Sequence, residues 1–117
     1  MDVKASNNMS NQERYNYLVD SVLQNKQIWL LQSSDESYAM FEDANGQSYV
    51  AIWPDKESAV PFAIDDWEGY TPARMGLGEF LNWMNELKKD GIMIGAFPDS
   101  AMHSLAVDPL DFKKQLT

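Results

Sequence analysis

Apolar residues recur along two stretches of the chain at the spacing of one helix face. In the first stretch these positions are Tyr15, Leu18, Val19, Val22 and Leu23. In the second stretch they are Leu77, Phe80, Leu81, Met84 and Leu87. Ser10 and Glu13 have the form of a capping box ahead of the first stretch, and Gly91 follows the second, where a helix commonly ends. The pattern predicts two amphipathic helices.

Short apolar runs bounded by turn residues predict β-strands. The first runs lie close together, at residues 28–31, 38–41 and 49–53. Asn45 and Gly46 precede the last of them, and this pair favours the positive φ of a tight turn. We therefore expect an antiparallel meander of three strands.

Further strands and a last helix are expected in the second half of the chain. Residues 92–97 and 105–107 are apolar runs that we expect to pair with each other, and a shorter strand is expected within residues 67–74. Asp108 is a capping residue and Pro109 favours the first position of a helix. The final helix should therefore begin at this pair.

One more helix is expected after the third strand. Pro54 ends that strand, and Asp55 can cap a helix that extends toward Asp66. Pro61 lies inside this helix, lacks an N–H and clashes with the preceding turn. We therefore expect the helix axis to change near Val60.

These elements predict an α+β protein with the order αβββαβαββα. Strands come in runs interrupted by single helices, which favours a mixed, mainly antiparallel sheet and about four helices over a regular doubly wound fold. The chain of 117 residues is the size of one domain. We expect residues 1–9 to be a flexible N-terminal tail and residues 10–117 to form the single α+β domain.

Charge and composition limit the partners. The chain has 18 acidic and 9 basic residues, and this net charge of −9 repels phosphate backbones and anionic lipids. We therefore expect no nucleic-acid partner and no membrane partner, whereas a basic protein would be attracted. The lack of cysteine excludes disulfides, and no apolar run is long enough for a membrane span or a secretory signal. These features predict a cytoplasmic protein.

Several segments, taken in their order and spacing, resemble the bacterial family known as domain of unknown function family 2750. The resemblance covers residues 14–116 and is carried by residues 14–15, 28–32, 52–54, 67–70, 77–81, 90–92 and 97–98. Pro61 departs from the pattern of that family. The chain is more distantly similar to the N-terminal domain of SseB-type proteins. Neither domain is an established enzyme, so the resemblance implies a bacterial protein without an assigned reaction.

Catalytic and metal-binding patterns are missing from the sequence. His103 is the single histidine, and it has no partner at metal-ligand spacing and no nucleophile in a motif around it. The clustered carboxylates do not follow the ligand spacing of a calcium loop. Gly76 and Gly78 lack the lysine of a phosphate-binding loop. We predict no catalytic residue, no metal and no cofactor, with a small hydrolase built on carboxylates and His103 as an alternative.

Aromatic and acidic residues are concentrated in the connection that follows the third strand. Trp53, Trp67 and Tyr70 are of the types that commonly anchor interfaces, and Asp66 and Glu68 lie among them. Packing of this loop over the core is the competing interpretation. We predict a non-enzymatic protein-binding domain that uses these residues. The alternatives are an immunity-type antagonist of a basic toxin and a structural homo-oligomer.

Overall fold

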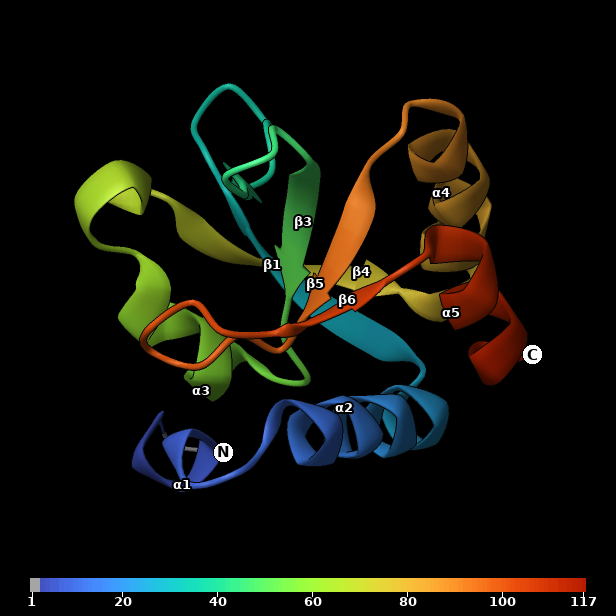
Figure 1. The fold of residues 1–117 in the computed structure, drawn as a ribbon, viewed down its shortest axis with the longest axis horizontal. Helices are drawn as coiled ribbons and strands as arrows, with labels where there is room; N and C mark the ends of the chain where they lie inside the picture. Colours follow the sequence, from blue (N-terminus) through green and yellow to red (C-terminus); the bar gives the residue numbers. More distant parts are fainter. Residues whose placement is uncertain (1–2) are drawn as a thin grey trace.

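The computed structural model describes residues 3–117 and arranges its strands in two sheets (Figure 1). In the smaller sheet, β1 (Gln27–Gln32) runs antiparallel to β4 (Thr71–Gly76). The larger sheet has the strand order β2-β3-β5-β6. Its members are β2 (Met40–Glu42), β3 (Ser48–Ile52), β5 (Met93–Ala96) and β6 (Leu105–Val107). Neighbouring strands of this sheet are antiparallel except for the parallel pair β3 and β5.

The α+β class and the antiparallel pairing of β2 with β3 are confirmed, but the meander of three strands is wrong. β1 reaches the other two strands only through isolated bridges, from Trp29 to Trp53 and from Gln32 to Tyr38. All six residues of β1 have a partner in β4, whereas β2 has three residues and is paired with β3. The regular ladder of β1 is therefore the one with β4, and its contact with the strands of the other sheet is limited to single bridges. The single mixed sheet expected from the sequence is therefore divided into two.

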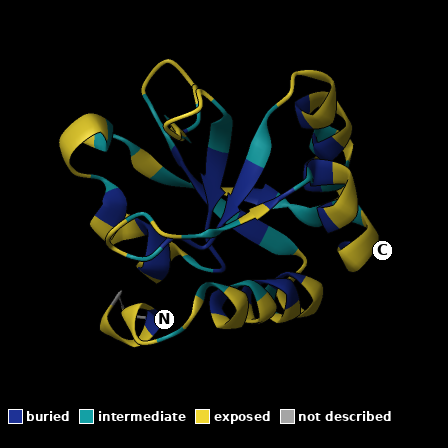
Figure 2. Cartoon of the chain, viewed as in Figure 1, coloured by how far each residue is buried: buried dark blue, intermediate teal, exposed yellow. Residues whose placement is uncertain are grey.

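Helices lie around the two sheets within the described range. They are α1 (Val3–Asn7), α2 (Asn11–Asn25), α3 (Lys56–Ala59), α4 (Leu77–Lys89) and α5 (Pro109–Leu116). α4 and α5 pack side by side, and α2 lies along another side, in contact with β1, β5 and β6 (Figure 1). The central strands are buried and the outer helix faces are exposed (Figure 2). None of the helices within residues 3–117 is long and apolar enough to span a bilayer.

The helix starts predicted from capping residues are confirmed. Ser10 Oγ accepts from the Glu13 N–H at 3.1 Å, and Glu13 Oε1 accepts from the Ser10 N–H at 2.9 Å, which completes the capping box. Asp55 Oδ1 accepts from the first turn of α3 at 2.8 Å, and Asp108 Oδ1 from the first turn of α5 at 2.9 Å. Each cap is formed between residues close in sequence, so the local pattern was sufficient to predict it.

Pro61 changes the helix as expected. α3 ends at Ala59, and the chain continues as a 3-10 turn, η1 (Val60–Phe62), that contains this proline. A second 3-10 turn, η2 (Asp65–Trp67), follows. The helix predicted to extend toward residue 66 is therefore shorter than expected, and the η1 and η2 turns take its place.

The short helix α1 lies where the flexible tail was expected. Asn7 Nδ2 donates to Ser100 Oγ at 2.8 Å, and Asn7 Oδ1 accepts from the Ser100 N–H at 2.9 Å. Ser6, in the same helix, is buried. Residues 1 and 2 of that tail lie outside the described residues. The helix α1 therefore contacts the connection between β5 and β6.

Burial along α4 predicts which leucine matters for stability. Leu87 is 2% exposed in the core, whereas Leu81, predicted from its spacing to face the same way, is only half-buried. Leu87→Ala is therefore expected to lower the free energy of unfolding by about 2–5 kcal/mol through lost burial and a cavity, and Leu81→Ala by less. Urea denaturation of both variants measures the difference. An equal loss for the two leucines would show that the helix is rotated relative to this description.

Candidate functional site

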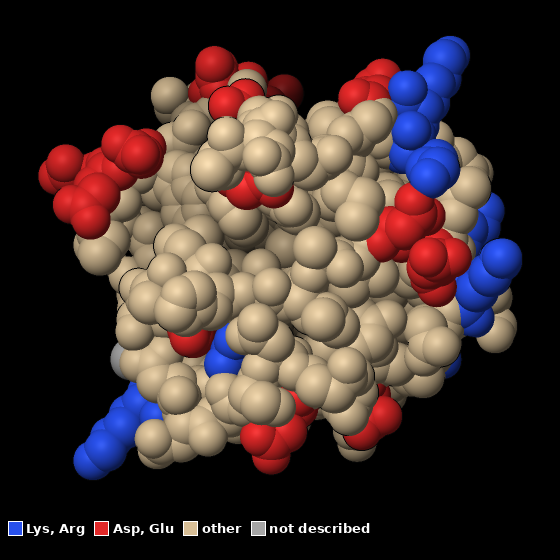
Figure 3. Space-filling model, in the orientation of Figure 1, with Lys and Arg blue, Asp and Glu red and all other residues tan. Residues whose placement is uncertain are grey.

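A groove of about 700 Å³ opens beside β2. Figure 3 shows a hollow flanked by acidic side chains that lie over η2 and over the loops next to β2. The apolar lining consists of Met40, Phe41, Phe62, Ile64, Trp67 and Met102. The polar lining consists of Glu42, Ser48, Asp65, Asp66 and Ser100. We call this hollow the β2 groove.

One wall of the β2 groove is the edge of a sheet. Met40, Phe41 and Glu42 are successive residues of β2, the outermost strand of its sheet, and all of them line the groove. Successive side chains of a strand point to opposite faces. A hollow that touches three residues in a row therefore includes the edge of the strand and not only one of its faces.

Phe41 is held in place by two neighbours. Its ring stacks on that of Tyr49, the residue opposite it in β3, with the ring centroids 5.2 Å apart. Its Cζ atom lies 2.7 Å from the position that a Cβ atom would take at Gly95 of β5. A side chain at position 95 would displace the ring, so glycine there allows Phe41 to lie against the sheet.

The opposite wall comes from the η1 and η2 turns. Phe62 and Trp67 both rest on the buried Trp53, at ring centroid distances of 5.2 and 6.3 Å. Ile64, between them, is 60% exposed. Asp65 has a φ of 52°, a left-handed conformation that aspartate tolerates better than most residues. This turn places Asp65 and Asp66 at the rim while Phe62 and Trp67 stay inside.

The connection between β5 and β6 supplies Ser100 and Met102. Asp99 organises this turn, because its Oδ1 atom accepts from the Ala101 N–H at 3.0 Å and from the His103 N–H at 2.8 Å. The Asp99 N–H in turn donates to the His103 carbonyl at 2.9 Å. The turn therefore presents Met102 to the groove from a closed hydrogen-bonded loop.

Arg14 of α2 anchors that same connection from below. Its side chain is 1% exposed, and its Nε donates to the Phe97 carbonyl at 2.9 Å and its Nη2 to the His103 carbonyl at 3.0 Å. The remaining guanidinium hydrogens have acceptors in the Ser6 carbonyl, the Met9 carbonyl and Asn11 Oδ1. Asp99 Oδ2 lies 3.9 Å from Nη2 and balances the charge. All five N–H groups of the guanidinium are thus satisfied.

Sequence reasoning missed this role for Arg14, although a signal was present. Arg14 lies four and eight residues before Leu18 and Val22, which are buried on α2. Residues at these intervals share one helix face. An arginine at that position must either leave the face or find acceptors inside the protein, and only the tertiary structure shows that the acceptors exist.

The electrostatics of the β2 groove are one-sided. Among the described residues that line it, Glu42, Asp65 and Asp66 are acidic, and lysine and arginine are absent. Beside Glu42, the Tyr49 hydroxyl donates to Asp43 Oδ2 at 2.9 Å. This hydrogen bond lowers the pKa of Asp43 and raises the pKa of Tyr49. The carboxylate of Asp43 therefore stays ionised to a lower pH than an ordinary aspartate, next to the acidic rim.

The structure brings some of the predicted binding residues into the groove and leaves others out. Asp66 and Trp67 line it. Glu68 is exposed and Tyr70 is half-buried, and neither lines the groove. Trp53 is fully buried, so its expected position at the surface is wrong.

The burial of Trp53 has a backbone cause. Trp53 and Trp29 exchange backbone hydrogen bonds of 2.8 and 2.9 Å, which extend the strand beyond Ile52. Pro54 follows this bridge, so the strand ends after Trp53, as the sequence predicted. The indole lies in the core, where Phe62 and Trp67 pack on it. The other lining residues come from separate segments, and the sequence offers no signal that joins them.

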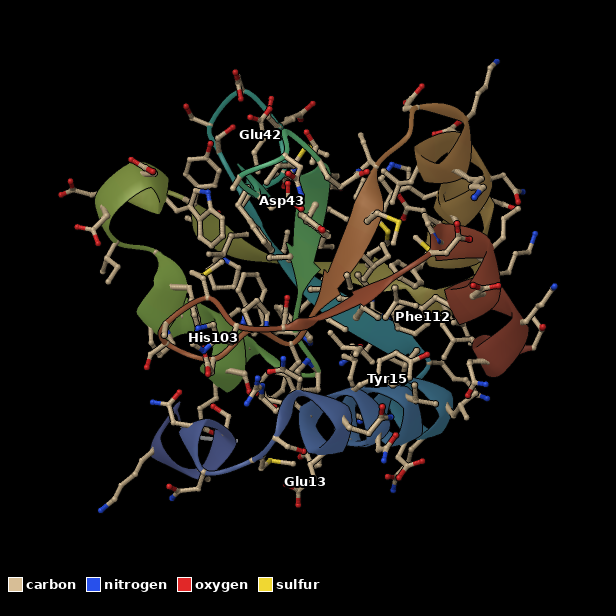
Figure 4. All side chains as sticks on the ribbon, viewed as in Figure 1. Glu13, Tyr15, Glu42, Asp43, His103 and Phe112 are labelled. Carbon is tan, nitrogen blue, oxygen red and sulfur yellow. The ribbon has the colours of Figure 1, made fainter. Side chains whose placement is uncertain are left out.

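The side chains considered for catalysis do not converge. His103 is 72% exposed, and its Nδ1 lies 3.4 Å from Asp99 Oδ2. Ser100 Oγ bonds Asn7 and not His103. In Figure 4, His103 lies apart from Glu42 and Asp43, which are near the turn between β2 and β3. No three histidine or acidic side chains within the described residues form a group that could hold a metal ion.

Comparison with known proteins identifies a family. The model of a family described as "Protein of unknown function (DUF2750)" matches residues 15–116. No curated protein and no solved structure matches the chain, and the comparisons do not show the more distant similarity to the SseB domain. The match extends from α2 to α5 and includes every strand. The chain therefore belongs to the DUF2750 family of proteins of unknown function.

Proposed function

We propose that this protein binds a basic segment of another protein in the β2 groove. The observation that carries the proposal is the groove itself, in which an apolar floor is bordered by carboxylates and no lysine or arginine is among the described lining residues. Interfaces of this kind combine a buried apolar anchor with a charged rim. The rim charges would attract and orient the partner, and the floor would supply most of the affinity.

The exposed apolar side chains support this proposal. Met40 and Ile64, on opposite walls of the groove, are 38% and 60% exposed. Methionine adapts its shape to an incoming apolar group, and Met102 is a second methionine in the lining. A basic partner fits best because the whole chain carries a net charge of −9. An immunity-type antagonist of a basic toxin would be one form of such a protein.

The hydrolase alternative has less support. A nucleophile, a base and an orienting carboxylate must lie within hydrogen-bond reach of one another. Ser100 is engaged by Asn7, and His103 contacts Asp99 from an exposed position outside the groove lining. We therefore propose binding rather than catalysis for this surface.

The proposal predicts that a natural partner depends on Trp67. Partners captured from the native host are identified by mass spectrometry, purified and measured by calorimetry. Trp67→Ala is expected to weaken binding about thirtyfold, because truncating an aromatic anchor typically costs about 2 kcal/mol or more. Ile64→Ser is expected to weaken it as well without a loss of stability, because Ile64 is 60% exposed. Tyr70→Ala is the matched control, and it should retain the wild-type affinity because Tyr70 does not line the groove.

The charge of the rim is tested with two double variants of equal net charge. Glu42→Lys with Asp66→Lys reverses the charge on both walls, whereas Asp20→Lys with Asp90→Lys changes exposed residues on α2 and at the end of α4. Only the first pair is expected to slow association and to reduce its dependence on salt. Circular dichroism establishes that each variant is folded. A partner that binds Trp67→Ala and the groove double variant as tightly as wild type would place the binding surface elsewhere.

A further inference from the structure

The outer edge of β2 carries backbone groups that the fold does not use. The Ala39 carbonyl accepts from β3 at 3.4 Å, and the Asp43 N–H donates at 3.0 Å to the residue before β3. In an antiparallel pair, residues whose N–H and C=O groups bond the neighbouring strand alternate with residues whose N–H and C=O groups point away from it. The backbone groups of Phe41 therefore also face β3, and those of Met40 and Glu42 point the other way. No residue within the described range bonds the backbone of Met40 or Glu42 on that side.

That free edge borders the β2 groove. Met40 and Glu42 line the groove, and Ile64, Asp66 and Trp67 line the wall across from them. The space beside the strand is therefore bounded by apolar side chains and by carboxylates. An extended peptide that lay in this space would have backbone partners on one side and side-chain contacts on the other.

We infer that the partner binds as an extra β-strand along the outer edge of β2, with alternating apolar and basic residues. This inference rests on the proposed function and specifies its mode of recognition. Alternate side chains of an added strand point in opposite directions, so one set can reach the apolar floor while the other meets the acidic rim. The backbone bonds to Met40 and Glu42 provide affinity that does not depend on sequence, and the groove provides selectivity.

A second copy of this chain fits the edge poorly. Pairing of two β2 edges would bring together two grooves that each carry Glu42, Asp65 and Asp66. Like charges in close apposition oppose association. A short edge strand that carries a charge is a common way to prevent such self-pairing. The same carboxylates favour a strand with lysine or arginine at alternate positions.

Two synthetic peptides of equal composition test the mode of binding. One alternates lysine and isoleucine over about six residues, the usual length of a strand, and the other carries the same residues as a lysine block followed by an isoleucine block. The alternating peptide is expected to bind at least about tenfold more tightly, a difference of about 1.4 kcal/mol. Its binding should also slow hydrogen exchange at the Met40 and Glu42 amides by at least about tenfold, with a smaller change at Phe41.

A proline variant isolates the backbone contribution. Met40→Pro removes one outward N–H that β3 does not use, a position where an edge strand tolerates proline. Met40→Val removes the same side chain but keeps the N–H. Binding of the alternating peptide should therefore be at least about tenfold weaker for Met40→Pro than for Met40→Val. Circular dichroism and thermal melting establish that both variants fold.

The possible results separate this inference from the proposed function. Equal binding of the two peptides, lost in Trp67→Ala and without protection of the Met40 amide, would overturn strand addition and leave the groove as a binding site. If neither peptide bound, strand addition by a basic segment would be overturned. The groove as a binding site would still be tested with the natural partner. A peptide-free dimer with a protected Met40 amide would identify a second copy as the occupant and overturn the inference.

Discussion

Arg14→Met is expected to lower the free energy of unfolding by about 3–5 kcal/mol, the usual cost of removing one member of a buried charged network. The substitution removes the five N–H donors of the guanidinium. Buried carbonyls that accept from them, among them that of Phe97, are left without a partner. It also leaves Asp99 without its cation. This loss is a large share of the roughly 5–15 kcal/mol that stabilises a typical domain.

Two further variants make the expectation for Arg14 testable even if Arg14→Met does not fold. Arg14→Lys keeps the charge but has three donors and no planar fork, so its loss of stability should be intermediate. Arg74→Met is the matched control, because Arg74 is exposed and its removal strands no buried carbonyl. Urea denaturation followed by tryptophan fluorescence measures all of them. Similar losses for Arg14→Met and Arg74→Met would show that the network around Arg14 contributes little.

Arg14 also links stability to the proposed site. Its bonds to the carbonyls of Phe97 and His103 hold the two ends of the connection that carries Met102. In Arg14→Lys, the amide hydrogens of this connection should exchange faster than they do in the wild type, by more than those of the rest of the core. Binding in the β2 groove should weaken in parallel, because one part of its lining is no longer held in place.

Trp53→Ala is expected to cost about 3–5 kcal/mol, as is usual for truncation of a buried aromatic residue. Trp53 is completely buried, and Phe62 and Trp67 both pack on its ring. Trp83→Ala, at a half-buried position of α4, is the matched control and should cost less. If Trp53→Ala were folded and as stable as wild type, the indole would belong to the surface, as the sequence pattern suggested.

Trp53→Phe separates the volume of the ring from its hydrogen-bonding group. The indole Nε1 atom has no acceptor among the described residues, so phenylalanine at this position forfeits no hydrogen bond to them. The loss of stability should therefore be much smaller than for alanine. Phenylalanine should also keep Trp67 in position, so peptide binding in the β2 groove should persist in this variant, whereas Trp67→Ala should weaken it strongly.

Several features of this protein follow from residues that are close in sequence. The capping box of Ser10 and Glu13, the caps at Asp55 and Asp108, and the break at Pro61 depend on neighbours within one or two helical turns. Local chemistry and periodicity specify such features without reference to the rest of the chain. The α+β class follows for the same reason, because it depends on the types of the elements and their order.

Pairing between distant segments was decided only in the tertiary structure. The apolar run of β1 is compatible with several partner strands, and its pairing with β4 depends on which available strand matches its whole length. Trp53 illustrates the same limit, since a bridge to Trp29 converts an apparent strand end into part of the core. Sequence periodicity specifies which residues seek burial, but not which distant residues will cover them.

Only part of the candidate site could likewise be predicted from the sequence. Asp66 and Trp67 could be singled out from composition, because aromatic and acidic residues cluster around them in one connection. The β2 groove also needs Met40 from an edge strand and Met102 from a turn held by Arg14. The sequence by itself determined the local elements and the acidic character of the chain. The tertiary structure alone decided where these segments meet, because the contacts that join them span most of the chain and leave no local periodicity.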